Sequence, residues 1–233
     1  MTSVAVIAAH PDDEILGCGG TIVRHRQAED DVHVLILAEG VTSRDDKRDR
    51  YVRSKELSAL GDAAHKANEI VGSTSLTIFG FPDNRMDSVD LLEIVKTVES
   101  FLVEKNPSIV YTHHTGDLNI DHRCVHNAVV TACRPIPGNV VDQLLFFEVP
   151  SSTEWQVCSS ETPFVPSWFV DIGGTLHTKR EALKAYASEM REWPHPRSLD
   201  AVTQLARWRG ATVGVEAAEA FILGRMIRRK LEL

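Results

Sequence analysis

The stretch that decides the fold is Ala9-His10-Pro11-Asp12-Asp13-Glu14, which stands between an apolar run and a helical pattern. The apolar run before it, Val4-Ala5-Val6-Ile7-Ala8, is typical of a strand that is covered on both faces of a sheet. Four titratable side chains therefore follow directly after a strand that is predicted to be buried. We expect this stretch to be the chemical centre of the protein.

Apolar runs alternate with helical patterns along the first two-thirds of the chain. Further strands are predicted at 32–38, 76–79, 109–111, 144–149 and 169–172. Helices are predicted at 15–26, in the stretch that follows the charged segment 43–53 and runs to Val71 with an interruption near Gly61, at 88–104 with Ser88 as its cap, and up to about Cys133. Glycines 17, 19 and 20 in the first helix indicate close approach of its backbone to the sheet. This alternation predicts a Rossmann-like, doubly wound, mostly parallel α/β sheet with helices on both faces.

The last third of the chain is predicted to be an added helical part of the same domain. Its helices are expected at Leu176–Glu192, Leu199–Arg209 and Val215–Arg229. No repeat, low-complexity tract or linker interrupts the sequence. We therefore expect residues 1–233 to form a single domain.

Composition narrows the class of protein. Hydrophobic residues make up 43% and charged residues 25%, and the formal net charge is -8 at pH 7, which argues against binding to nucleic acid or to anionic membranes. No apolar run approaches the roughly 20 residues that span a bilayer, and no signal peptide is recognisable. The four cysteines, Cys18, Cys124, Cys133 and Cys158, are widely spaced, as expected for buried thiols in a reducing compartment. We expect a cytoplasmic enzyme without membrane insertion.

A second polar cluster, His113 to His122, follows the strand at 109–111. Because ligands of such sheets bind beyond the carboxyl ends of the strands, the two clusters are expected to meet at one edge. The possible metal ligands are His10, Asp12, Asp13, Glu14, Asp117, Asp121, His122 and His126. A catalytic zinc typically takes three such ligands and leaves a position for water, and a spare carboxylate beside it can take the proton of that water. These parts suffice to hydrolyse an amide or an ester.

Plainer interpretations exist for the same residues. Asp12, Asp13 or Asp121 could each simply cap a helix, and either His122 or His126, one helical turn apart, could face the core. A structural metal site in a binding protein is a further alternative, but such sites are usually closed by four ligands rich in cysteine. A dehydrogenase is disfavoured because the first strand is not followed by G-x-G-x-x-G.

The motif at 9–14, continued by Gly17-Cys18-Gly19-Gly20, resembles the signature of the PIG-L (LmbE-like) superfamily of zinc-dependent de-N-acetylases. Blocks at 81–87, 116–123, 194–198 and 217–221 resemble one bacterial branch of it. The resemblance implies that His10, Asp13 and His122 bind Zn2+ or another divalent transition metal and that Asp12 is the general base. It leaves His126 a supporting or packing role, and it implies a homo-oligomer, a trimer or hexamer.

One position departs from that pattern. Better-known members carry a histidine three residues before the third metal ligand, where this chain has Asn119. An asparagine can donate a hydrogen bond to an oxyanion but cannot deliver a proton. Either Asp12 shuttles the proton in both directions or another group supplies it, and His113 and His114 are the nearest candidates. We take Asp12, Asn119 and His114 as the candidate catalytic residues.

Candidate substrate-binding residues lie around these clusters. Glu39 matches a family carboxylate near the sugar site, and Asp83 and Arg85 lie in the loop after the third strand. Arg53 could grip a phosphate, although an exposed helical arginine is usually only solvated. His195 and Arg197 stand in a proline-rich turn that could close over the site or merely join two helices. The four tryptophans could stack on a sugar, although packing in the core or an interface is the default expectation.

The expected activity is hydrolysis of an N-acetyl group on an amino sugar or its conjugate. The alternatives are a zinc amidase that acts on a non-sugar N-acyl small molecule, and a non-catalytic metal-containing binding protein. The substrate is in each enzymatic case a small molecule.

Overall fold

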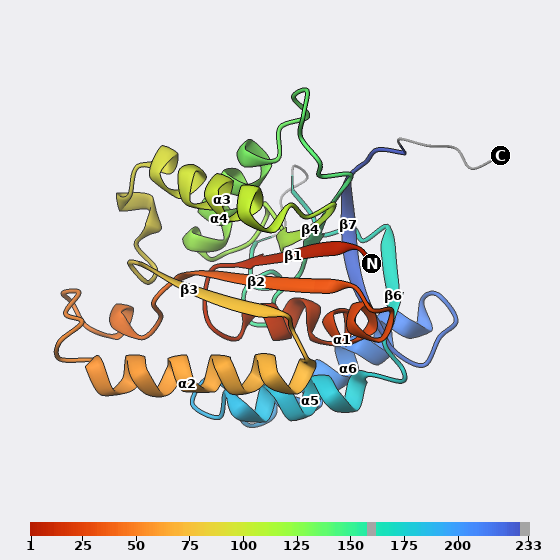
Figure 1. Cartoon of the computed structure of the whole chain (residues 1–233). Helices are drawn as coiled ribbons and strands as arrows, with labels where there is room; N and C mark the ends of the chain where they lie inside the picture. Colours follow the sequence, from red (N-terminus) through yellow and green to blue (C-terminus); the bar gives the residue numbers. More distant parts are fainter. Residues whose placement is uncertain (158–161, 229–233) are drawn as a thin grey trace.

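A seven-stranded sheet with the order β3-β2-β1-β4-β5-β7-β6 forms the centre of the computed structural model, which describes residues 1–157 and 162–228 (Figure 1). The strands are β1 (Ser3–Ala8), β2 (Asp31–Ala38), β3 (Ser75–Phe81), β4 (Ile109–His113), β5 (Gln143–Phe147), β6 (Trp168–Asp171) and β7 (Ala218–Met226). The first five strands run parallel, whereas β7 is antiparallel to both β5 and β6. The predicted mostly parallel α/β fold is confirmed.

Helices cover both faces of this sheet. They are α1 (Asp13–Gln27), α2 (Ser54–Val71), α3 (Leu91–Lys105), α4 (Ile120–Ala132), α5 (Leu176–Ala185) and α6 (Leu199–Ala211), with short 3-10 turns at Thr42–Arg44 and Met86–Ser88. Figure 1 shows α3 and α4 on one face and α1, α2, α5 and α6 on the other. Alternate residues of β1 enter the two core layers, because successive side chains of a strand point to opposite faces.

The strand order reverses between β1 and β4. The chain leaves β1 through α1 on one face of the sheet and leaves β4 through α4 on the other. The loops that follow these neighbouring strands therefore diverge and leave a crevice between them, which is where parallel α/β sheets bind ligands. Both polar clusters, at 10–14 and 113–122, lie at this edge.

Two glycines let α1 lie close to the sheet, as the sequence predicts. A Cβ at Gly17 would lie 2.5 Å from the ring of Phe147, and one at Gly20 would lie 2.7 Å from Cγ2 of Ile172. Real Cβ atoms do not approach other heavy atoms so closely, so a larger residue at either position would push α1 away from its neighbours.

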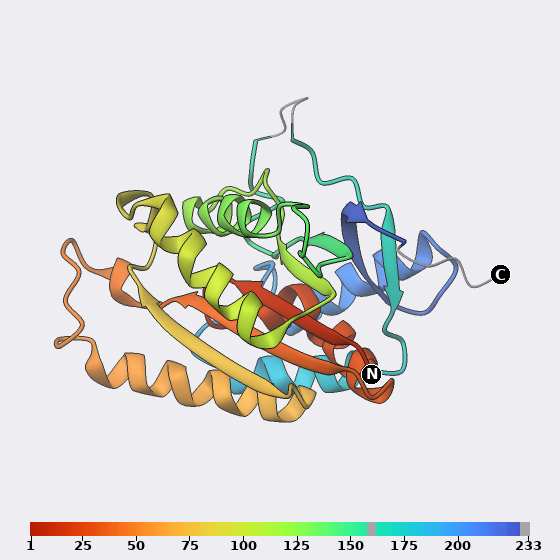
Figure 2. The same cartoon turned by 45° about the horizontal axis from the view of Figure 1, so that its top comes forward.

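The predicted helix at Val215–Arg229 is wrong. Residues 218–226 form β7, which fills the sheet between β5 and β6, and Figure 2 shows β6 and β7 side by side. Alanine and glutamate favour helix locally, but every residue from Ala218 to Phe221 is buried, so ladder pairing and packing on both faces outweigh local propensity. The prediction at Arg229 itself lies outside the described residues.

The predicted ends and caps of the helices are confirmed in part. The helix predicted at Leu176–Glu192 ends at Ala185, and α2 continues through Gly61 without interruption. Asp90, and not Ser88, caps α3, because its carboxylate accepts the N–H of Leu92. Gly72 ends α2 as predicted, with a φ of 77°.

The tryptophans and cysteines differ in how well their predictions hold. Trp155, Trp193 and Trp208 are exposed, so they do not pack in the core of the chain. Cys18 and Cys133 are buried and Cys124 is half-buried, each without a disulfide, while Cys158 lies outside the described residues.

In the described ranges, none of the helices has the length and apolarity that crossing a membrane would require.

Candidate active site

The loop after β1 is held in an unusual conformation. Asp12 has a backbone φ angle of 113°, a value that residues other than glycine rarely adopt. Its N–H donates to the Glu14 carboxylate over 3.1 Å, and the same carboxylate accepts hydrogen bonds from the Asn68 amide and the Tyr186 hydroxyl. Burial raises the pKa of Glu14 to about 7. The Glu14 carboxylate holds the backbone at Asp12, and two buried contacts from distant segments hold that carboxylate in turn.

The three predicted metal ligands come together at the end of this loop. Asp13 Oδ2 lies 3.3 Å from Nδ1 of His10 and 3.2 Å from Nε2 of His122. Asp13 and His122 are fully buried, and neither Asp13 Oδ1 nor either ring nitrogen of His122 has a partner with hydrogen-bond geometry among the described residues. Two imidazoles and a carboxylate with unsatisfied buried atoms fit a divalent transition metal.

Electrostatics at this cluster also favour a cation. Burial disfavours a charged imidazole, yet the carboxylates of Asp13 and Asp117 raise the pKa of His122 to about 9. Burial opposes ionisation of Asp13 as well, but the imidazoles beside it hold its pKa well below the ordinary value. The cluster therefore attracts positive charge, which a proton or a metal ion can supply.

A second group, His10, Asp83 and Asp121, also has ligand atoms close together. The Asp121 carboxylate, however, already accepts the N–H groups of Asn84 (2.6 Å) and Met86 (2.9 Å) and lies 2.9 Å from Nε2 of His10. Both of its oxygens are therefore occupied, whereas Asp13 Oδ1 has no hydrogen-bond partner among the described residues. Asp121 thus orients His10 and does not cap α4, which excludes the plainer interpretation of this residue.

Asp12 is paired with an arginine from a remote turn. Nη1 of Arg197 donates to Asp12 Oδ2 over 2.9 Å, and Nε of the same arginine donates to Oγ of Ser151 over 2.8 Å. Burial raises the pKa of Asp12, and the guanidinium opposes that shift. The Asp12 side chain makes no capping hydrogen bond to α1, so its interpretation as a simple helix cap is wrong.

A cavity of about 120 Å³ opens beside these residues. Its polar lining consists of His10, Asp12, Ser43, Arg44, Asp83, Asn84, Asn119, Glu189 and Arg197, and its remaining lining of Pro11, Gly40, Val41 and Leu60. Five of the predicted site residues therefore share this cavity, and one of them, His10, also belongs to the candidate metal cluster with Asp13 and His122. The lining groups can hydrogen-bond a polar small molecule from several sides.

Asn119 is fixed at the rim of the cavity. Its side-chain oxygen accepts the N–H of Asp121 and so caps α4, while its amide nitrogen donates to the side-chain oxygen of Asn84 over 2.9 Å. The cap determines which end of the amide faces away from the helix. The Asn119 amide nitrogen is thereby directed at Asn84, which also lines the cavity.

The two histidines at the end of β4 point in different directions, as neighbouring residues of a strand do. His113 accepts the N–H of Ala9 at Nε2 over 2.8 Å and stacks on His122 with ring centroids 4.0 Å apart. His114 lies against the carbonyl oxygen of Thr162 and the ring of Phe164. Neither histidine is among the residues that line the cavity.

Two of the predicted substrate-binding residues are engaged with other charges. Glu39 accepts hydrogen bonds from Arg48 and Thr42 and pairs with Arg50. Arg53 forms a bidentate ion pair with the Asp45 carboxylate, with both N···O distances at 2.6 Å. Neither belongs to the lining of the cavity.

The other two predicted substrate-binding residues that do not line the cavity, Arg85 and His195, contact the loops around it. Arg85 donates to the backbone carbonyls of Asp45 and Asp46, which ties the loop after β2 to the loop after β3. His195 accepts the N–H of Arg197 and packs edge-on against Trp155. His126 donates to the His113 carbonyl oxygen over 2.9 Å and packs on Phe146, as expected for a packing residue.

Sequence reasoning missed the opposite walls of the cavity. Arg44, after β2, and Glu189, after α5, form an ion pair of 2.8 Å across 145 positions of sequence. Asn84, beside the predicted Asp83, has a φ of 51° and joins the Asn119 network. Adjacency to Asp83 was a usable signal for Asn84, whereas no local pattern links Arg44 with Glu189.

Comparison with known proteins places the chain among deacetylases. The family model described as PIG-L, GlcNAc-PI de-N-acetylase, matches residues 5–133. The uncharacterized deacetylase YaiS of Escherichia coli is 29% identical over 191 residues, which cover 79% of this chain and 90% of that protein. A probable N-acetyl-alpha-D-glucosaminyl L-malate deacetylase 2 of Bacillus anthracis is 25% identical over 215 residues, covering 88% and 90%.

Among solved structures, GalB, the 4-carboxy-2-hydroxymuconate hydratase of Pseudomonas putida, superposes with a TM-score of 0.77 at 22% identity over the whole of both chains. A likeness at that identity concerns the fold alone. The family model, by contrast, covers more than half of the sequence, including both clusters of the site. The protein belongs to the PIG-L family of deacetylases.

Proposed function

We propose that the protein removes the N-acetyl group of an amino sugar or of a conjugate of one, with a divalent transition metal, zinc in the first instance, bound by His10, Asp13 and His122. The observation that carries the proposal is that the ligand atoms of these three side chains lie close together and that one of them, His10, lines the same polar cavity as Asp12. Family membership and relatives named as deacetylases support the reaction class.

A metal held by His10, Asp13 and His122 would lower the pKa of a water molecule and polarise a carbonyl oxygen. Asp12, at the inner wall of the cavity, takes the proton of the attacking water as general base. Arg197 stabilises the ionised form of Asp12 and holds one of its oxygens. Asn119 presents an amide donor for the carbonyl oxygen of the acetyl group, where negative charge develops.

The leaving amine also needs a proton. His114 faces Thr162 and Phe164 and is not in the cavity lining, which argues against its role as general acid. Asp12 carries a proton after the first step and lies in the cavity. We therefore assign both proton transfers to Asp12, with His114 left as a structural residue.

The chemistry of the cavity favours a sugar. Carboxylates, amides and guanidinium groups on several walls suit the hydroxyls of a pyranose ring. The small volume suits an acetyl group better than a long acyl chain. A non-sugar N-acyl substrate is the second candidate, and the same assay separates the two.

The experiment is amine release by the zinc-loaded protein from N-acetylglucosamine, nucleotide-linked N-acetyl sugars and N-acetyl amino acids. We expect release from at least one amino sugar, and a rate about 10²- to 10⁴-fold lower in Asp12→Asn. Asp62→Asn, on an exposed part of α2, is the matched control and should behave as the wild type. Release only from N-acetyl amino acids would transfer the proposal to the non-sugar amidase.

Three further expectations accompany this proposal. We propose that the chain forms one domain and that it assembles into trimers or hexamers, a state that light scattering of the purified protein measures directly. We also propose a cytoplasmic setting, since the three described cysteines are free thiols and the chain carries a net charge of -8. A monomer in solution would contradict the oligomer proposal alone.

A further inference from the structure

We propose that Asp117 is a positioning residue for the metal ligand His122, and that the loop from Val149 to Thr153 holds Asp117 in place. The inference rests on the proposed function, because it requires His122 to bind a metal. It concerns a residue outside the three ligands and the base. It also gives a function to the loop after β5.

Asp117 is a buried carboxylate with an unusual number of partners. It is 1% exposed, and its Oδ1 lies 3.1 Å from Nδ1 of His122. The Asn119 N–H donates to the same oxygen over 2.9 Å, and the Ser152 hydroxyl donates there too. The Thr153 hydroxyl donates to Oδ2 over 2.7 Å. Burial opposes its charge, but His122 and the two hydroxyls hold the pKa of Asp117 far below the ordinary value.

The two nitrogens of His122 therefore face different groups. Nε2 faces Asp13, on the side of the metal ligands, and Nδ1 faces Asp117. A carboxylate at the far nitrogen keeps the proton there, orients the ring and leaves the other nitrogen as an electron-pair donor for the metal. His10 shows the same arrangement, with Asp13 at Nδ1 and Asp121 at Nε2.

The two supporting carboxylates differ in what holds them. Asp121 is fixed by the N–H groups of Asn84 and Met86, in the loop after β3. Asp117 instead depends on two hydroxyls, of Ser152 and Thr153, in the loop after β5. The orientation of His122 is thus sensitive to the loop from Val149 to Thr153, whereas that of His10 is not.

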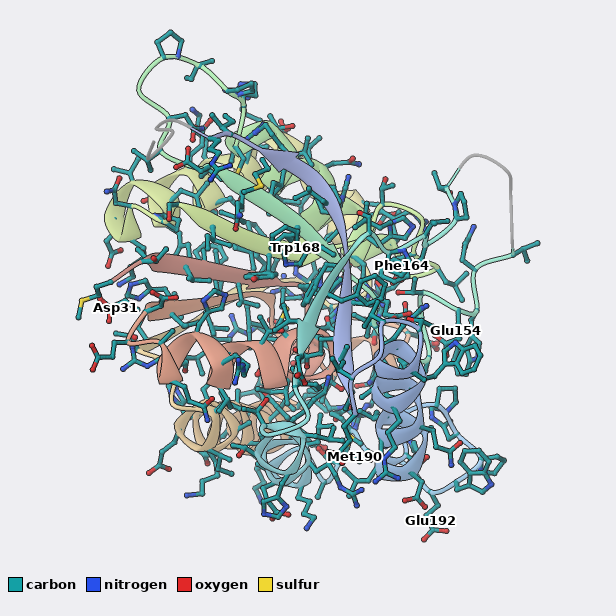
Figure 3. All side chains as sticks on the ribbon, turned by 90° about the vertical axis from the view of Figure 1, so that its right-hand side faces the viewer. Asp31, Glu154, Phe164, Trp168, Met190 and Glu192 are labelled. Carbon is teal, nitrogen blue, oxygen red and sulfur yellow. The ribbon has the colours of Figure 1, made fainter. Side chains whose placement is uncertain are left out.

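The same loop also reaches the base. Ser151, with a φ of 67°, accepts a hydrogen bond from Arg197, which in turn binds Asp12. Figure 3 views the molecule from the side on which this part of the chain and the segment after α5 both lie, with Glu154 labelled in one and Met190 and Glu192 in the other. Ser152 therefore contacts Asp117 beside the proposed metal ligand His122, and the neighbouring Ser151 contacts Arg197 beside the proposed base Asp12.

Because Ser151 and Thr153 contact different groups, their variants can be compared by zinc affinity alone. The affinity is measured by competition with a chromogenic chelator. We expect Asp117→Asn to weaken zinc binding by about 10- to 100-fold and Thr153→Val, a near-isosteric change, to weaken it by less. Ser151→Ala should leave zinc affinity unchanged, because Ser151 contacts Arg197 and not Asp117. Asp62→Asn is the control for loss of a carboxylate.

The visible absorption of the cobalt-substituted protein reports ligand geometry independently of activity. We expect its bands to shift in Asp117→Asn and to stay unchanged in Ser151→Ala. If Asp117→Asn and Thr153→Val lower only the melting temperature, with wild-type zinc affinity and cobalt spectrum, Asp117 merely fastens the loop and the inference is overturned while the proposed function stands. A wild-type protein that binds neither metal would overturn both.

Discussion

Asp12 combines three features that rarely coincide in one residue: burial, a φ of 113° and a guanidinium on its carboxylate. Such a backbone conformation costs of order 1–3 kcal/mol and persists only where the surroundings hold it. Glu14 holds the N–H and Arg197 holds the side chain. Strain at a residue that lines a polar cavity indicates a function, since a plain turn would place glycine there.

Arg197→Met tests the contribution of the guanidinium to the base. Loss of a hydrogen bond to a charged group costs about 1.5–3 kcal/mol, so kcat should fall roughly 10- to 100-fold. The guanidinium opposes the burial that raises the pKa of Asp12, so its removal raises that pKa further. Because the base acts when ionised, the acidic limb of the kcat/KM profile should move to higher pH.

Zinc affinity provides the contrast for this variant. Arg197 contacts Asp12 and Ser151 and none of the three ligands, so zinc binding should be retained in Arg197→Met. Arg207→Met, an exposed arginine of α6, serves as the control. An acidic limb at the wild-type position would show that Arg197 does not act on Asp12.

At the scale of elements, α1 is joined to α5 and β7 by a buried ion pair. Glu219 of β7 accepts the N–H groups of Gly20 and Thr21, and Lys179 of α5 donates to Glu219 (2.6 Å) and to the carbonyl oxygen of Leu16 (2.7 Å). The pair thus satisfies backbone groups of α1 where the helix meets the sheet. It explains why a glutamate stands in an otherwise apolar buried strand.

Lys179→Met should destabilise the fold by about 3–5 kcal/mol, because it leaves the Glu219 carboxylate buried without its partner. Lys184→Met, which breaks an exposed pair with Glu181 on the same helix, should cost at most about 1 kcal/mol. Urea denaturation measures both, and the double variant Lys179→Met/Glu219→Gln should lose less than the sum of the single variants. Equal costs for the two lysines would refute the structural role of the pair.

At the scale of the whole molecule, the site joins segments that leave the sheet on opposite faces. His10 and Asp13 follow β1, and His122 lies on α4 after β4. A metal held by all three connects the two halves of the fold at the point where the strand order reverses. Binding to the folded state alone must therefore add to global stability.

Chelation should accordingly lower the melting temperature. At free zinc 100-fold above its Kd the ligand contributes about 2.7 kcal/mol, which for a chain of this size corresponds to roughly 5–10 °C. His122→Asn should abolish the difference between zinc-loaded and chelated protein, while His65→Asn, at an exposed position of α2, should retain it. Differential scanning calorimetry measures the shift, and an identical melting temperature with and without chelator would contradict a metal bound at this point.

The local pattern of apolar residues was sufficient to predict most strands of the sheet and to locate the candidate site residues that follow β1. The apolar run at 4–8 predicts β1 because a strand covered on both faces has few other solutions, and His10, Asp12 and Asp13 follow it within five residues. It failed for β7, where Ala218 to Phe221 has helical propensity but lies between two strands. Local preference is worth only fractions of a kcal/mol per residue, and pairing with distant strands exceeds it.

Other features depend on contacts between residues that are far apart in the chain. Arg197 reaches Asp12 across 185 positions and Glu189 reaches Arg44 across 145, and neither pair has a local signature. The side on which His113 and His114 point, and the partners that occupy Glu39 and Arg53, likewise follow from packing. The motif after β1 supplies the proposed base and two of the proposed metal ligands. Its geometry comes from the loops, helices and strands that close around it, because only long-range packing can hold a strained, buried, charged loop in one conformation.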